Sequence, residues 1–165
     1  MNSKIKNMFD KLLAGKCFNA ILMILVSLLI NSCSGPRIIT DEDLLIELQR
    51  TPCYGTCQVY TVKIDKNGKG LFEGVENVEK IGRFSFSLSQ DELMEIENAF
   101  HQVDFYRLKN IYDAQVSDLP TTYITYNKDG NRKKIMDYYG GPEELRNLEN
   151  SIETLVLSKK MKKIR

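Results

Sequence analysis

Strand and helix signals meet in RFSFSLSQDELMEIENAFHQV, residues 83–103. In 83–88, large apolar residues alternate with serine, which is the two-residue period of a half-buried strand. Ser89 and Glu92 then form a capping-box pattern, with a serine N-cap and a glutamate three residues later. Beyond the box, apolar residues recur at helical spacing: Leu93, Ile96, Phe100 and Val103. A strand that leads into an amphipathic helix predicts a sheet with a helix packed on it.

The segments on either side extend this pattern. Alternating residues predict strands at 44–49, 59–64, 71–75, 121–127 and 133–139. Hairpin turns are indicated by Asn67-Gly68 and Asp129-Gly130. A last helix should begin with Pro142 at its first position, followed by two glutamates. Its apolar stripe is Leu145, Leu148, Ile152 and Leu155. We therefore expect an α+β fold, a mostly antiparallel sheet with two amphipathic helices packed on one face as a two-layer sandwich.

Composition limits the class of protein. The chain has 165 residues, 42% of them hydrophobic and 27% charged, which suits one globular domain. The chain has 23 lysines and arginines and 22 aspartates and glutamates, so it lacks the excess of positive charge with which a protein attracts nucleic acid. We expect no nucleic-acid partner.

The N-terminal residues resemble a bacterial lipoprotein signal. Residues 1–16 hold four lysines and one aspartate, and residues 17–30 are almost wholly apolar. That apolar run would be about 21 Å long as a helix, short of a bilayer core, so a cleaved signal over 1–32 is favoured over an uncleaved anchor. Ile30-Asn31-Ser32-Cys33 resembles a lipobox, in which the cysteine is acylated, although Asn31 departs from the usual small residue.

This resemblance implies a location. Acylated Cys33 would attach the protein to a lipid bilayer through a tether, residues 33–40. We expect a cell-envelope protein on a bacterial membrane, the outer membrane by preference, with its domain in the periplasm or at the cell surface. The folded domain should span 41–158, and the basic residues 159–165 should be a frayed, solvated helix end or a contact for lipid phosphates.

The stretch RTPCYGTCQVY, residues 50–60, carries the chemistry-bearing pair Cys53 and Cys57. In an oxidising compartment a disulfide is the default outcome for such a pair. A disulfide that closes so short a loop stabilises the fold by about 2 kcal/mol.

The same stretch, with the N-G-K-G hairpin and the helix after S-F-S-L-S, resembles the family called domain of unknown function 6438. The similarity covers about residues 44–156, and Gln58 stands where many relatives have proline. The resemblance implies a small α+β domain with a cysteine pair near its start. It implies no activity.

Three other functions are compatible with chemistry-bearing residues of the sequence. A thiol-redox or copper-handling protein would use Cys53 and Cys57, but C-x-x-x-C before a strand lacks the helix N-terminus that activates a thiolate. A copper or zinc site needs more ligands than this pair and His101 supply. Asp113 and Asp118 of the irregular segment 104–120 leave a hydrolase as the remaining possibility. We expect no catalytic residues, metal or cofactor.

Tyrosine offers a binding surface. Four tyrosines surround the second hairpin: Tyr123, Tyr126, Tyr138 and Tyr139. They are interpreted either as cross-strand packing or as a ligand face for an unidentified protein or glycan. The leading functional hypothesis is a non-enzymatic binding or structural domain pinned by a Cys53–Cys57 disulfide.

Overall fold

The computed structural model describes residues 38–164, so the expected signal and the Cys33 attachment site lie outside the described residues. In chain order the elements are β1 (Leu44–Arg50), β2 (Val59–Asp65), β3 (Lys69–Glu76), β4 (Gly82–Ser87), α2 (Gln90–Gln102), a 3₁₀ turn (Phe105–Arg107), β5 (Ile111–Tyr112), β6 (Thr122–Lys128), β7 (Asn131–Asp137), α3 (Glu143–Leu157) and β8 (Lys162–Lys163). Among the described helices, none is long and apolar enough to cross a membrane.

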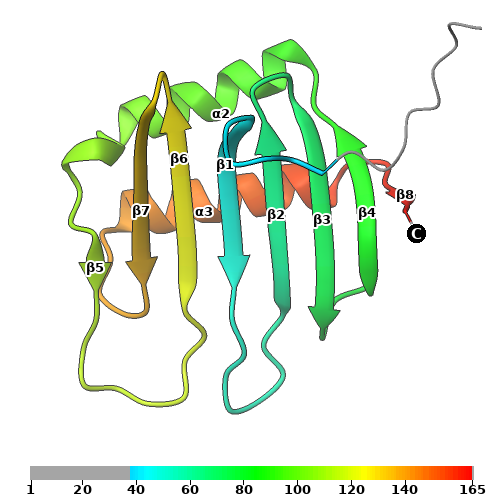
Figure 1. The fold of residues 1–165 in the computed structure, drawn as a ribbon. Helices are drawn as coiled ribbons and strands as arrows, with labels where there is room; N and C mark the ends of the chain where they lie inside the picture. The colour runs from blue at the N-terminus through cyan, green and yellow to red at the C-terminus, as the bar shows by residue number, and fades with distance from the viewer. Residues whose placement is uncertain (1–37, 165) are drawn as a thin grey trace, which may run out of the picture. The chain divides into compact units, whose positions relative to one another are not determined.

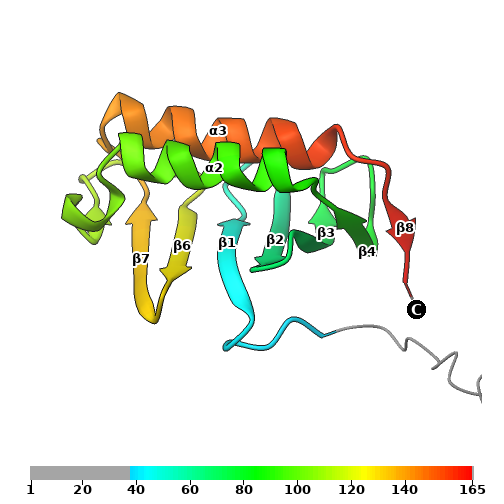
Figure 2. The ribbon, with the colours of Figure 1, turned by 90° about the horizontal axis from the view of Figure 1, so that it is seen from above.

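The strands form one sheet in the order β5-β7-β6-β1-β2-β3-β4-β8 (Figure 1). Neighbouring strands are antiparallel except for the short pair of β5 with β7. Both helices cross the strands on the same face of the sheet (Figure 2). The expected two-layer α+β sandwich is confirmed.

The core lies between this face and the helices. Leu48 pairs with Val62 on one side and with Ile124 on the other, and all three side chains are fully buried. Helix α2 contributes Phe100, whose ring stacks on Tyr126 with centroids 4.1 Å apart. The alternation that predicted the strands thus places one set of apolar residues under the helices.

Local signals explain how the elements begin. The capping box of α2 is confirmed, since the Ser89 hydroxyl accepts from the Glu92 N–H and the Glu92 carboxylate accepts from the Ser89 N–H. In the second hairpin, Asp129 and Gly130 both have positive φ, as the Asp-Gly pattern predicts. In the first, only Gly68 does, and the Asp65 carboxylate accepts from two backbone N–H groups.

Three expectations were wrong in detail. Pro142 is the N-cap of α3, not its first helical residue, because its ψ of 154° is extended. The residues after α3 are not a frayed helix end: β8 pairs with β4, and Lys159 forms an ion pair with Glu92. The segment 104–120 is not wholly irregular, since it contains the 3₁₀ turn and β5.

Candidate functional site

The cysteine pair closes a loop between β1 and β2. Cys53 and Cys57 form a disulfide with their Cα atoms 5.7 Å apart. At the tip of this loop Tyr54 is 91% exposed. The bond constrains a loop that contributes no large side chain to the core, so it fixes the loop's shape and leaves its tip in solvent.

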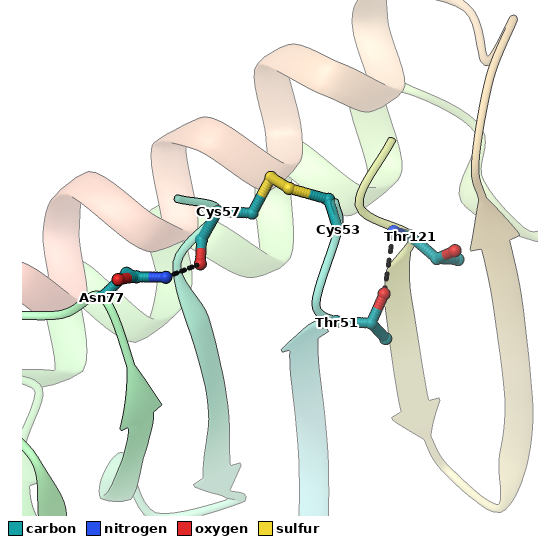
Figure 3. The surroundings of a disulfide bond; sticks show 5 residues. All are labelled: Thr51, Cys53, Cys57, Asn77 and Thr121. Carbon is teal, nitrogen blue, oxygen red and sulfur yellow. Dashed lines mark hydrogen bonds between the residues drawn. A yellow bond between two sulfur atoms is a disulfide. The ribbon is translucent and has the colours of Figure 1, made fainter. Parts of the chain in front are cut away.

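Hydrogen bonds tie this loop to its neighbours (Figure 3). The backbone N–H of Thr51 donates to the carbonyl of Thr121 over 3.0 Å, and the N–H of Thr121 donates to the Thr51 hydroxyl over 2.9 Å. On the other side, the Asn77 amide donates to the carbonyl of Cys57 over 3.0 Å. The loops before β6 and after β3 are therefore both held against the disulfide loop.

A fourth segment joins through Tyr138, whose hydroxyl donates to the carbonyl of Val116 over 2.9 Å. All these segments leave the same end of the sheet, the lower end in Figure 1. We call residues 51–58, 76–81, 113–121 and 138–144 together the loop rim.

Beneath the loop rim, Arg50 connects the sheet to α3. Its guanidinium donates to the Tyr60 hydroxyl over 3.2 Å and to the Thr122 hydroxyl over 3.3 Å. It also donates to the Asn150 amide oxygen over 3.1 Å and pairs with the Glu153 carboxylate at 2.9 Å. Because these partners come from β2, β6 and α3, one side chain fixes where β1 ends and the disulfide loop begins.

Two carboxylates are buried beside this arginine. Glu149 of α3 is 3% exposed, and its Oε1 atom has no hydrogen-bond partner. Burial raises the pKa of Glu149 to about 8, and repulsion from Asp137 acts in the same direction, against the attraction of Arg50. Glu149 is therefore mostly protonated at neutral pH.

Asp137, at the end of β7, is 8% exposed. Burial raises its pKa, while a hydrogen bond from the Gly141 N–H and the charges of Arg146 and Arg50 oppose this rise. A Cβ on Gly141 would lie 2.4 Å from the Asp137 carboxylate, so glycine permits this close approach. The chain turns here from the sheet into α3.

The predicted tyrosine face is not one surface. Tyr126 is 1% exposed and packs under α2, so its inclusion was wrong. Tyr123 lies three residues earlier in β6 and therefore points to the opposite face, where Lys134 lies 4.6 Å from its ring centroid. Tyr138 and Tyr139 follow β7, and Tyr139 is half exposed.

In the described part of the chain, no hydrogen bond joins the other candidates to the cysteine pair. His101 lies exposed in the last turn of α2, and a β-strand, not a helix, follows Cys57. Asp113 and Asp118 are exposed on the loop before β6. Within residues 38–164, no group of three or more His, Cys, Asp or Glu side chains is arranged to hold a metal ion.

Sequence reasoning singled out the cysteines but missed Arg50 and Glu149. Arg50 stands in the same motif, at the first position of RTPCYGTC. Glu149 lies in the apolar stripe of α3, between Leu148 and Ile152. A glutamate within an apolar stripe indicates a buried carboxylate, and this signal was present in the sequence.

Residues 44–156 match the model of a family described as Domain of unknown function (DUF6438). The matched range begins with β1 and ends inside α3, so it contains the motif, the disulfide and the Arg50 cluster. Comparison with curated proteins finds no match.

Proposed function

Because the chain belongs to the DUF6438 family, to which no activity is attached, we propose a function from this chain's own residues. The protein is a lipid-anchored component of a bacterial cell envelope, preferably of the outer membrane, and its domain binds a partner without catalysing a reaction. Cys33 is the acylated residue, and the Cys53–Cys57 disulfide pins the binding domain.

The disulfide loop carries this proposal. It holds a nearly fully exposed tyrosine in a fixed loop, and disulfides persist in oxidising compartments outside the cytosol. The basic, apolar and Cys33-containing start of the sequence agrees with that compartment.

The buried polar groups support binding over catalysis. The guanidinium of Arg50 is occupied by four side-chain partners, and the carboxyl group of Glu149 is shielded from solvent. A catalytic acid or base must reach the substrate's proton directly or through one water. The cluster fits a role in holding the loop rim in place.

The test is mass spectrometry of the protein extracted from membranes, with thiols alkylated before and after reduction. We expect a mature N-terminus at Cys33 that carries acyl chains, and Cys53 and Cys57 that react only after reduction. A Cys33→Ser variant should lose the acyl chains and keep the disulfide.

Two results would overturn the proposal. An uncleaved or unacylated N-terminus would remove the lipid anchor. Cys53 and Cys57 thiols that alkylate in the native protein, or that carry copper, would point to thiol or copper chemistry instead.

A further inference from the structure

Exposed apolar side chains gather at the loop rim. Ten large hydrophobic residues are conspicuously exposed in the described part of the chain, and five of them lie on the rim: Tyr54, Ile81, Val116, Leu119 and Tyr139. Each of the four rim segments contributes at least one. By contrast, the hairpin turns at the opposite end of the sheet expose charged and polar residues. Exposed apolar side chains concentrated at one end of a domain indicate an interaction site.

The rim is also acidic. It carries six carboxylates: Glu76, Glu79, Asp113, Asp118, Glu143 and Glu144. The one basic residue within these ranges, Lys80, already pairs with Glu79 at 3.5 Å, and the guanidinium of Arg146, two residues beyond them, donates to the carbonyl of Gly141. Residues 38–164 carry 17 lysines and arginines and 21 aspartates and glutamates, and outside the rim the two signs nearly balance, so the negative excess of this part of the chain lies on the rim.

The rim is organised before any partner arrives. The disulfide closes its first segment, the hydrogen bonds of Thr51 and Asn77 join segments 113–121 and 76–81 to it, and that of Tyr138 joins segment 138–144 to segment 113–121. Arg50 anchors the base of the disulfide loop to α3. Less conformational entropy is then lost on binding, which is the advantage of a preorganised surface.

We propose that the loop rim is the binding surface of this protein and that its partner is a protein segment carrying lysine or arginine beside apolar side chains. The inference rests on the proposed binding function and adds the surface and the chemistry of the partner. Tyr54 is the central apolar contact, and the carboxylates of the rim attract the basic groups.

The charge of the rim argues against other occupants. An anionic bilayer surface would repel six carboxylates, and a second copy docked rim to rim would place like charges together. A basic segment neutralises the rim and covers its apolar side chains. In such an interface the tyrosine supplies contact area, and the attraction between carboxylates and lysine or arginine guides the partner to the surface.

The test compares three labelled synthetic peptides of equal length by fluorescence anisotropy. One alternates lysine with leucine, one replaces each lysine by glutamate, and one replaces each leucine by serine. The protein is the full chain in nanodiscs of neutral phospholipid, with empty nanodiscs as the blank. We expect the lysine–leucine peptide to bind at least ~10-fold more tightly than either counterpart, and hydrogen exchange to slow at the rim.

Variants locate the binding surface. Tyr54→Ala should weaken binding ~10-fold, the size of a typical interface hot spot, and leave the thermal unfolding temperature unchanged because the ring is exposed. Glu144→Lys should weaken binding most at low salt. The matched controls Met94→Ala and Glu95→Lys, exposed on α2, should change affinity by less than ~2-fold.

Several outcomes would overturn the inference. These are equal affinity for the lysine and glutamate peptides, hydrogen exchange that slows on α2 or on the sheet face without helices and not at the rim, or unchanged peptide affinity in Tyr54→Ala. Binding of the protein to anionic vesicles in place of the peptide would assign the rim to a membrane. A full chain with Cys33→Ser, assayed against the same peptides in neutral detergent, should bind them with unchanged affinity, so a failure here is distinguishable from a failure of the lipid anchor.

Discussion

Replacing Glu149 by glutamine should remove a pH-dependent loss of stability. The pKa of Glu149 is raised from 4.5 to about 8 in the folded protein, so the folded state holds a proton that the unfolded state releases. The stability associated with this proton is complete below pH 4.5 and is lost as the pH rises towards 8. Asp137, whose pKa is also raised by burial, acts in the same direction.

The size of the effect follows from linkage. With pKa values of 4.5 unfolded and about 8 folded, ionisation of Glu149 lowers the free energy of unfolding by about 3 kcal/mol between pH 6 and pH 9. Glutamine has nearly the same shape and no charge. Glu149→Gln should therefore lose less than about 1 kcal/mol over the same interval.

The measurement is urea unfolding followed by far-ultraviolet circular dichroism, since the chain contains no tryptophan. No reductant is added, so that the disulfide stays intact. Glu95→Gln, which changes an exposed carboxylate on α2, should follow the parent protein. A parent whose stability is constant from pH 6 to pH 9, or a Glu149→Gln variant with the parent's slope, would refute the reasoning.

Three further predictions concern stability. Reducing the Cys53–Cys57 bond should lower the free energy of unfolding by about 2 kcal/mol, measured as a lower urea midpoint, and the double serine variant should no longer respond to reductant. Arg50→Met should cost about 3 kcal/mol by chemical unfolding, because it leaves a partly buried carboxylate of α3 unpaired; a loss below about 0.5 kcal/mol would contradict this. Tyr126→Phe should stabilise the protein by about 1 kcal/mol, since its buried hydroxyl has no hydrogen-bond partner. Tyr60→Phe should destabilise it by about 1 kcal/mol through loss of the hydrogen bond to Arg50. For either variant, a thermal unfolding temperature that shifts in the opposite direction would contradict its prediction.

The fold could be predicted because its signals are local. Ser89 and Glu92 cap α2 within four residues, and strand alternation sorts residues by face without knowledge of their partners. Pro142 was placed one residue too far into its helix, because a φ of −63° suits both the N-cap and the first helical position. Strand β8 was missed because two lysines have no strand signal of their own and pair only when Phe84 and Ser85 are near.

The site could be predicted only in part. Cys53 and Cys57 are four residues apart, so their pairing could be inferred without the fold. The contact of Arg50 with Glu153 joins residues 103 positions apart, and only the packing of α3 on the sheet brings them together. The spacing of Tyr123 and Tyr126 could have shown that they do not share a surface, because positions separated by an odd number of residues lie on opposite faces of a strand. Tyr126 is the buried one of the two.

The spacing of the motif has a structural reason. Arg50 and Tyr60 are directly opposite each other in the β1–β2 ladder and hydrogen bond through their side chains, so residues 51–58 must leave the sheet and return before β2 begins at Val59. The disulfide narrows this excursion at Cys53 and Cys57 and leaves only 54–56 beyond it. The motif thus combines positions that fix the shape of the loop with a tip, 54–56, that does not help to stabilise the domain. Changes at the tip should alter binding without altering stability, whereas an insertion between Arg50 and Cys53 should disturb both, because it shifts the disulfide loop away from the cluster that anchors it.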